Sequence, residues 1–158
     1  MKGSRTMPTR SKEILTVDAV HRRTPLLRRI VRDFVDCYNR RKKNREFLDE
    51  LSIIARKFNS PEIDETIYRL QREVADFNRD MDAYEKEIRA LGGVLKDRER
   101  GLVYFHSVRE DRRIYLIWDI NHPDVVSWHE LGETYSDRVP IDLPEDAATA
   151  AMDGPDRE

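Results

Sequence analysis

The sequence has little of what secreted and membrane-spanning proteins are built from. It contains one cysteine, Cys37, so no intramolecular disulfide can form, and such sparing use of cysteine is typical of the reducing cytoplasm. No apolar run approaches the roughly 20 residues that a membrane-spanning helix needs. The basic N-terminal segment lacks the apolar stretch of a secretory signal. We therefore expect a cytoplasmic protein that neither enters a membrane nor depends on disulfides.

Recognised catalytic motifs are also missing. The sequence has no Gly-x-Ser-x-Gly, P-loop, Gly-x-Gly-x-x-Gly, Cys-x-x-Cys or His-Glu-x-x-His motif. Ser107 and Ser127 have no recognisable base partner, and Cys37 lies on an apolar helix stripe, where an inert buried thiol is expected. Nucleophilic catalysis therefore finds no support in the sequence, and no cofactor is predicted.

Charge is nearly balanced over the whole chain but not along it. The 29 Lys and Arg residues against 31 Asp and Glu give a net charge of -2. Residues 1–12 carry four basic residues and no acid, whereas residues 138–158 carry six acidic and two basic residues. Because both ends have little to bury, we predict a disordered basic head over residues 1–11 and a disordered acidic tail over residues 143–158. Residues 12–142 then form a single domain.

A long helical hairpin is predicted over residues 17–91. Thr16 fits an N-cap, and apolar residues recur at helical spacing over residues 17–38 and again over residues 47–58. Pro25 falls inside the first stretch and removes a helical hydrogen bond, so it predicts a kink or a restart of the helix.

The second helix of the hairpin has the most regular pattern in the chain. Ser60 before Pro61 marks the turn and the new helix start, and Gly92 with Gly93 marks its end. The apolar residues between them alternate at spacings of four and three: Ile63, Ile67, Leu70, Val74, Phe77, Met81, Tyr84, Ile88 and Leu91. This spacing favours a coiled-coil seam over the broader stripe of a helix packed on a globular core.

Beyond Gly93 the composition becomes typical of β-structure. Four short segments predict strands: residues 94–96, 102–106, 113–120 and 125–129. Their short connections require antiparallel neighbours. Residues 113–120 are apolar on both faces, so we expect the hairpin to cover one face and a partner chain or a terminal segment the other, with residues 13–15 as a possible edge strand. The predicted fold is α+β: a long antiparallel, coiled-coil-like helical hairpin, then a small antiparallel sheet of three to five strands, with a β-meander over residues 94–130.

The C-terminal half carries a pattern that resembles a known family. The matching residues, in order, are Gly93, Val94, Lys96, Asp97, Gly101, Leu102, Val103, Phe105, Arg113, Tyr115, Leu116, Trp118, Trp128, His129, Glu130, Leu131, Arg138, Val139 and Pro140. Residues 15–19 and 25–28 look like the opening helix of the same family. Over residues 13–141 the chain thus resembles a small prokaryotic family catalogued as domain of unknown function 2203. The resemblance implies no established activity, substrate or cofactor.

Four positions depart from that family's usual pattern. Tyr104, Ile117, Asp119 and His122 stand where an acid, a cysteine, a basic residue and a glutamate are common. If the family's acids form a catalytic or metal site, two of its members are absent here. His106, His122 and Asp119 could join a histidine of the next strand as metal ligands, but no pair has the spacing of a known motif, so no metal site is predicted.

The most suggestive candidate site is the Trp128-His129-Glu130 segment. Strand alternation places Trp128 and Glu130 on one face and His129 on the other. A histidine beside an acid can act as a general base or a ligand. Alternatively, Trp128 is core, His129 bonds a backbone carbonyl and Glu130 caps a turn. In the first case Trp118 or Trp128 forms a stacking wall and Arg138 attracts an anionic ligand, so the predicted ligand-binding set at the sheet rim is Trp118, Trp128, His129, Glu130 and Arg138.

Five basic residues cluster between the two apolar stretches of the first predicted helix: Arg40, Arg41, Lys42, Lys43 and Arg45. Such a block can bind nucleic acid through phosphates. In an antiparallel hairpin that turns near residue 60, however, residue 60-n faces 60+n, which brings the block near the acids Glu73, Asp76, Asp80 and Asp82 of the second helix. The block also leaves Val74, Phe77 and Met81 without apolar cover from the first helix. We therefore expect a second chain or the sheet to cover them, and we predict a homodimer or another homo-oligomer.

These observations support three hypotheses about function. The leading one is a non-enzymatic cytoplasmic interaction protein that self-associates through its helical hairpin and could also bind a different protein partner. The alternative is a small-ligand or metal-assisted enzyme with a site around Trp128, His129 and Glu130. A weaker alternative is nucleic-acid binding through residues 40–45.

Overall fold

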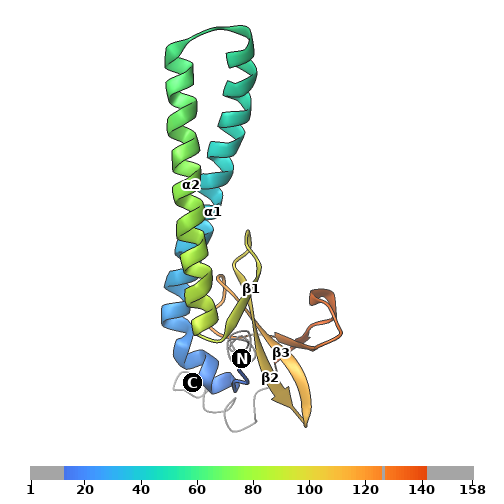
Figure 1. Cartoon of the computed structure of the whole chain (residues 1–158). Helices are drawn as coiled ribbons and strands as arrows, with labels where there is room; N and C mark the ends of the chain where they lie inside the picture. The colour runs from blue at the N-terminus through green and yellow to red at the C-terminus, as the bar shows by residue number, and fades with distance from the viewer. Residues whose placement is uncertain (1–12, 126, 142–158) are drawn as a thin grey trace, which may run out of the picture.

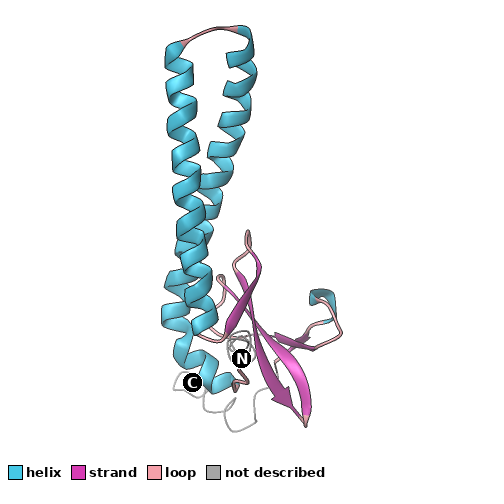
Figure 2. Ribbon diagram, in the orientation of Figure 1, coloured by secondary structure: helices cyan, strands magenta, loops and turns pink. Residues whose placement is uncertain are grey.

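The computed structural model describes residues 13–125 and 127–141 and shows a long helical hairpin joined to a small sheet (Figure 1). The helices are α1 (Val17–Lys57) and α2 (Pro61–Ala90). The remaining elements are β1 (Gly93–Asp97), β2 (Leu102–Arg109), β3 (Arg112–Asp119), β4 (Ser127–Glu130), the short 3-10 helix η2 (Tyr135–Asp137) and β5 (Val139–Pro140). The predicted α+β fold is confirmed (Figure 2). The predicted disordered head and tail lie outside the described residues.

The start of α1 follows the sequence prediction, and the helix continues through its proline. The Thr16 hydroxyl accepts the backbone N–H of Ala19 at 3.0 Å, as an N-cap does. Pro25 offers no N–H to the carbonyl of His21, which lies four residues earlier. The Thr24 hydroxyl donates to that carbonyl instead, at 2.8 Å. The helix therefore does not restart at Pro25 and runs without interruption to Lys57.

The ends of α2 also lie where the sequence places them. The Ser60 side chain accepts the backbone N–H of Ile63 at 3.3 Å, with Pro61 in the first turn. After the helix, Gly92 has a φ of +92°, the left-handed backbone that glycine adopts at helix ends. All nine residues of the predicted seam are buried or half-buried.

The two helices lie antiparallel in nearly the predicted register. The Arg41 guanidinium donates to the Asn78 side-chain oxygen at 2.7 Å, and the Asn44 amide donates to Glu73 at 2.9 Å. Both pairs lie within one helical turn of the predicted pairing. Among the described residues, no Lys or Arg of residues 40–45 forms an ion pair with an acid of α2. Within the described residues, the hydrogen bonds across the hairpin at this level run through asparagine side chains.

The sheet is a five-stranded antiparallel meander in the order β1-β2-β3-β4-β5. Its first four strands correspond to the predicted ones, and β5 was not predicted. The proposed edge strand at residues 13–15 is a single parallel bridge between Ile14 and His106. The turn between β2 and β3 consists of Glu110 and Asp111, which both have a left-handed backbone.

One face of the sheet, here called the inner face, packs against the base of the hairpin. The buried core between them draws residues from the segment before α1, from both helices, from β2 and β3, and from the β3–β4 connection. These residues are Leu15, Val20, Leu27, Ile30, Val31, Ile88, Val103, Phe105, Ile114, Leu116, Trp118 and Val125. Side chains of α1 also bond to loops of the sheet. Arg28 donates to the carbonyls of Ile120 and His122, both at 3.1 Å, and fixes the β3–β4 connection against the helix.

A second cluster lies farther along the hairpin, where Phe34 and Cys37 of α1 pack against Met81 of α2. The prediction that α1 gives Met81 no apolar cover was therefore wrong, because the register places Phe34 and Cys37 beside it. Phe77 packs at the edge of this cluster and carries the Arg40 guanidinium 5.5 Å from its ring centre. Burial raises the pKa of the Cys37 thiol, which keeps it in the less reactive protonated form.

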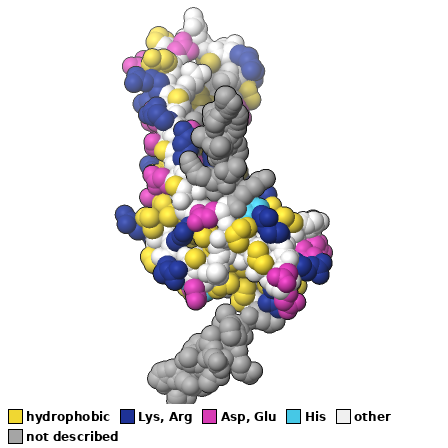
Figure 3. Space-filling model, turned by 60° about the horizontal axis from the view of Figure 1, so that its bottom comes forward, with side chains coloured by type: hydrophobic (Ala, Val, Ile, Leu, Met, Phe, Trp, Pro, Cys, Tyr) yellow, Lys and Arg dark blue, Asp and Glu magenta, His cyan; other side chains and the backbone are white. Residues whose placement is uncertain are grey.

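The outer half of the hairpin, residues 40–80, projects well beyond the sheet (Figure 1). Among its described residues only Leu70 is fully buried. In the view of Figure 3, basic and acidic side chains lie interspersed with hydrophobic ones, so this face has no large area of a single charge.

Candidate functional site

The structure divides the five predicted ligand-binding residues between the two faces of the sheet. Trp118 is fully buried in the inner core, and Trp128 packs against the same core from β4. His129 lies on the opposite, outer face, paired across β3 and β4 with Tyr115. Glu130 forms an ion pair with Arg112 at 3.0 Å. The tryptophans therefore do not form a stacking wall next to His129.

His129 makes the hydrogen bonds of a structural histidine. Its Nδ1 lies 2.8 Å from the backbone carbonyl of Glu130, and its Nε2 lies 3.1 Å from the Tyr104 hydroxyl. Because a carbonyl only accepts, Nδ1 carries the proton, and Nε2 accepts the Tyr104 O–H. Burial raises the pKa of the Tyr104 phenol, so this hydroxyl stays protonated. With His129 only 1% exposed, the pair is closed to substrates.

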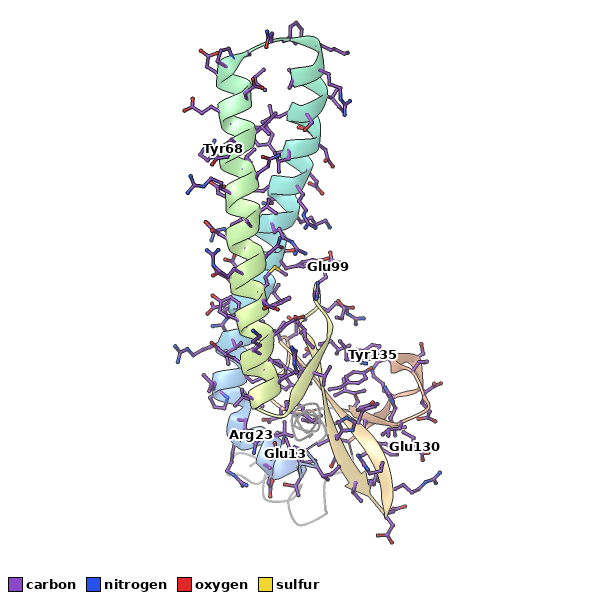
Figure 4. All side chains as sticks on the ribbon, viewed as in Figure 1. Glu13, Arg23, Tyr68, Glu99, Glu130 and Tyr135 are labelled. Atoms are coloured by element: carbon purple, nitrogen blue, oxygen red, sulfur yellow. The ribbon has the colours of Figure 1, made fainter. Side chains whose placement is uncertain are left out.

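The outer face carries a small cluster of its own beside this pair. Leu102, Tyr104 and Ile117 are buried there, and Tyr135 from η2 packs against them. Figure 4 shows Tyr135 between the η2 segment and the sheet. The predictions from sequence did not single out Tyr135, since a lone tyrosine in a turn has no periodic pattern to mark it.

Next to Tyr135 the outer face is hollowed by an open cleft of about 450 Å³. It is lined by Asp119, His122, Ser127, Tyr135, Arg138 and Pro140. Only Arg138 among these belongs to the predicted ligand-binding set. We call this hollow the outer cleft.

Two contacts shape the polar side of the outer cleft. Nδ1 of His122 lies 2.9 Å from a carboxylate oxygen of Asp119, which also accepts the backbone N–H of Asn121 at 2.8 Å. The Arg138 guanidinium lies 3.9 Å from the ring centre of Tyr135 and donates to that residue's carbonyl at 3.1 Å. Over residues 13–125 and 127–141, no three His, Cys, Asp or Glu side chains are grouped so that they could hold a metal ion.

The basic block on α1 is partly engaged by the protein itself. Arg40 pairs with Asp36 at 3.5 Å, and Lys42 pairs with Glu99 of the β1–β2 turn at 3.6 Å, which Figure 4 shows near the hairpin. Burial, together with the like charges of Arg45 and Arg98, lowers the pKa of Arg41. Lys43 and Arg45 have no ion-pair partner within the described part of the chain.

Four apolar residues follow one another at the outer end of α1, three within the helix and the last directly after it: Phe47, Leu51, Ile54 and Phe58. Three of them are strongly exposed: Phe47 at 46%, Ile54 at 39% and Phe58 at 62%. Phe47, Leu51 and Ile54 are spaced by four and three positions and share one side of α1. We call this surface the α1 stripe. None of the described helices is both long and apolar enough to cross a membrane.

Residues 13–141 match the family described as an uncharacterized conserved protein, domain of unknown function 2203. The chain belongs to this family. No curated protein and no solved structure matches it.

Several residues that match the pattern of domain of unknown function 2203 have structural roles in this chain. A Cβ atom on Gly93 would lie 2.6 Å from a methyl group of Val103, so only glycine lets β1 approach β2. Gly101 has a φ of +65°, and a Cβ atom there would lie 2.9 Å from a methyl group of Val31. Trp118 fills the inner core. These parts of the family pattern thus describe how the sheet closes on the hairpin.

Proposed function

We propose that this chain is a non-enzymatic interaction protein of the cytoplasm that forms a homodimer through the outer half of its helical hairpin. In this dimer, α1 of one copy lies against α2 of the other in coiled-coil-like packing. The exposed α1 stripe is the observation that carries the proposal.

The exposed residues of the α1 stripe lie to one side of the contact between the two helices of one chain. Leu48 and Ala55 are half-buried, on the side of α1 that faces α2. Because successive helix residues turn by about 100°, Phe47 and Ile54 lie roughly a quarter turn away from them. A four-helix bundle needs helices that present apolar residues toward two neighbours. Two hairpins side by side would satisfy this requirement and cover the stripe.

Charge supports the choice of a second copy as the occupant. Residues 40–57 contain seven basic and three acidic residues, whereas residues 61–80 contain six acidic and three basic ones. The ion pairs of Glu73 and Asp76 within the described residues are formed with arginines of α2 itself. A two-fold axis along the hairpin would place the basic α1 of each copy on the acidic α2 of the other, and such pairs fix orientation more than they add stability.

Sedimentation equilibrium of stripe variants tests the proposal. The wild-type chain is expected to show about twice its mass of 18.7 kDa at micromolar concentration. Ile54→Glu places a charge on the α1 stripe and should give the monomer mass, because a buried unpaired carboxylate opposes association.

Ile53→Glu is the matched control. Ile53 is even more exposed, at 52%, but lies on another side of the helix. This variant should keep the dimer mass. A monomeric wild-type chain, or equal dissociation by both variants, would contradict the proposal.

Binding of a polyanion through residues 40–45 is a second candidate, supported by the absence of ion-pair partners for Lys43 and Arg45 within the described residues. An electrophoretic shift that weakens steeply between about 50 and 200 mM salt is expected for phosphate contacts. Absence of a shift at low salt would contradict this candidate.

A further inference from the structure

The outer cleft contains a buried hydroxyl with nothing to bind. Ser127 is only 5% exposed, and its Oγ atom is buried without a hydrogen-bond partner within the described part of the chain. Buried polar groups in proteins are nearly always paired, because an unpaired one loses its hydrogen bonds to water without replacement. Ser127 is one of the residues that line the outer cleft.

The cleft also offers positive charge in a fixed position. The Arg138 guanidinium is held by its stack on Tyr135 and by its bond to the Tyr135 carbonyl. Arg100 approaches the same ring, with its guanidinium 4.9 Å from the ring centre, and donates to the Tyr135 hydroxyl at 3.4 Å. A guanidinium has five N–H donors, so these contacts leave donors of Arg138 for a ligand.

The carboxylate of Asp119, the acidic residue that lines the cleft, already accepts hydrogen bonds from the protein. The Asp119 oxygen that faces His122 accepts from both the imidazole and the backbone N–H of Asn121. These two contacts place donors around the carboxylate and orient the imidazole, whose Nε2 atom has no partner within the described residues. Hydrogen bonds do not remove the charge of a carboxylate, so an anionic ligand would lie on the Arg138 side of the outer cleft, away from Asp119.

We propose that the outer cleft binds a small oxyanion, a phosphate or carboxylate group, between the Arg138 guanidinium and the Ser127 hydroxyl. A planar guanidinium matches the oxygens of either group with two parallel hydrogen bonds. The serine hydroxyl donates a third and thereby satisfies its own buried oxygen. This site is separate from the hairpin surface of the proposed dimer, so each proposal can fail without the other.

Nuclear magnetic resonance titration of the full chain with inorganic phosphate, and separately with succinate, tests the site. Binding should shift the backbone resonances of Ser127, Tyr135 and Arg138 in a saturable way. Arg138→Gln should weaken binding about tenfold or more, and Ser127→Ala should weaken it several-fold, as expected for a charged and a neutral hydrogen bond. Response to phosphate alone or to succinate alone identifies which oxyanion the cleft accepts.

Arg113→Gln is the matched control, because Arg113 is an exposed arginine of β3 and its loss changes the net charge equally. It should leave the affinity unchanged. The proposal is overturned if neither anion gives saturable shifts at these residues, if Arg138→Gln binds as the wild type does, or if Arg113→Gln weakens binding equally. An unchanged melting temperature of Arg138→Gln, whose side chain is exposed, shows that a loss of binding is not a loss of folding.

Discussion

The Tyr104 hydroxyl and the His129 imidazole satisfy each other on the outer face of the sheet, and neither is open to solvent. The sequence leaves two roles open for His129, because a histidine beside an acid is compatible with chemistry and with structure alike. The two hydrogen bonds of its ring indicate the structural role. The acid next to it, Glu130, points to the other face and pairs with Arg112.

Tyr104→Phe should lower the free energy of unfolding by about 1–3 kcal/mol, because it leaves the buried Nε2 of His129 without its partner. Chemical denaturation at neutral pH measures this. Tyr68→Phe is the matched control, since Tyr68 is 60% exposed and should change stability by less than about 0.5 kcal/mol. Equal stability of Tyr104→Phe and the wild type would show that the hydroxyl contributes nothing to the pair.

The same residue makes stability depend on alkaline pH. Burial raises the pKa of Tyr104 in the folded chain above its usual value of 10.0, so the folded state favours the neutral phenol. The contribution of the neutral Tyr104 phenol to the free energy of unfolding is therefore fully present below pH 10. It is lost as the pH rises from there through the raised pKa of the folded chain. Tyr104→Phe should lose less stability than the wild type between pH 9 and pH 11.

At the scale of single elements, the β2–β3 turn contains the two non-glycine residues with a left-handed backbone within the described part of the chain. Glu110 and Asp111 have φ values of +52° and +66°, which suit the two-residue hairpin turn but disfavour L side chains. Replacing the pair with Asn-Gly should raise the free energy of unfolding by about 1 kcal/mol, because glycine and asparagine adopt this backbone at lower cost.

Thermal unfolding of this double variant measures the gain. Glu110→Gln with Asp111→Ser removes the same two charges without relieving the backbone and should leave stability unchanged. A gain of the same size in both variants would assign the effect to charge and contradict the backbone explanation.

The elements that could be predicted from sequence are those encoded by local chemistry. The caps at Thr16 and Ser60 are local signals, and the structure confirms them. The regular spacing of apolar residues along α2 is also local, and all nine of these residues are buried or half-buried. The two-residue strand β5 has no pattern long enough to read. The outer cleft brings together residues of β3, of the turn after it, of β4, of η2 and of β5. Its grouping therefore depends on the register of the sheet and on where the η2 segment folds back.

The prediction that Met81 needs cover from outside α1 failed for a related reason. A shift of the helix contact by less than one turn is enough to bring Phe34 and Cys37 to Met81. Spacing along one helix therefore identifies which side is buried, but packing between two helices decides which residues meet. The same register leaves the α1 stripe on the surface.

At the scale of the whole molecule, the chain divides into a well-packed base and a projecting outer hairpin. The inner core and the Phe34 cluster join the sheet to the lower hairpin. Beyond them, the exposed apolar residues of α1 and the opposite charges of α1 and α2 support our proposal that a second copy covers the α1 stripe. The near-zero net charge of the chain is therefore the sum of a basic outer α1 and an acidic outer α2.

Hydrogen exchange of the wild-type chain at two concentrations, one well below and one well above the dissociation constant from sedimentation, tests this central claim most directly. Amides of residues 47–58 should exchange more slowly at the higher concentration, because the dimer covers the α1 stripe and suppresses local opening of the outer hairpin. Amides of residues 27–37, packed in the base, should be unaffected. Identical exchange of residues 47–58 at both concentrations, or a change confined to the sheet, would contradict the account.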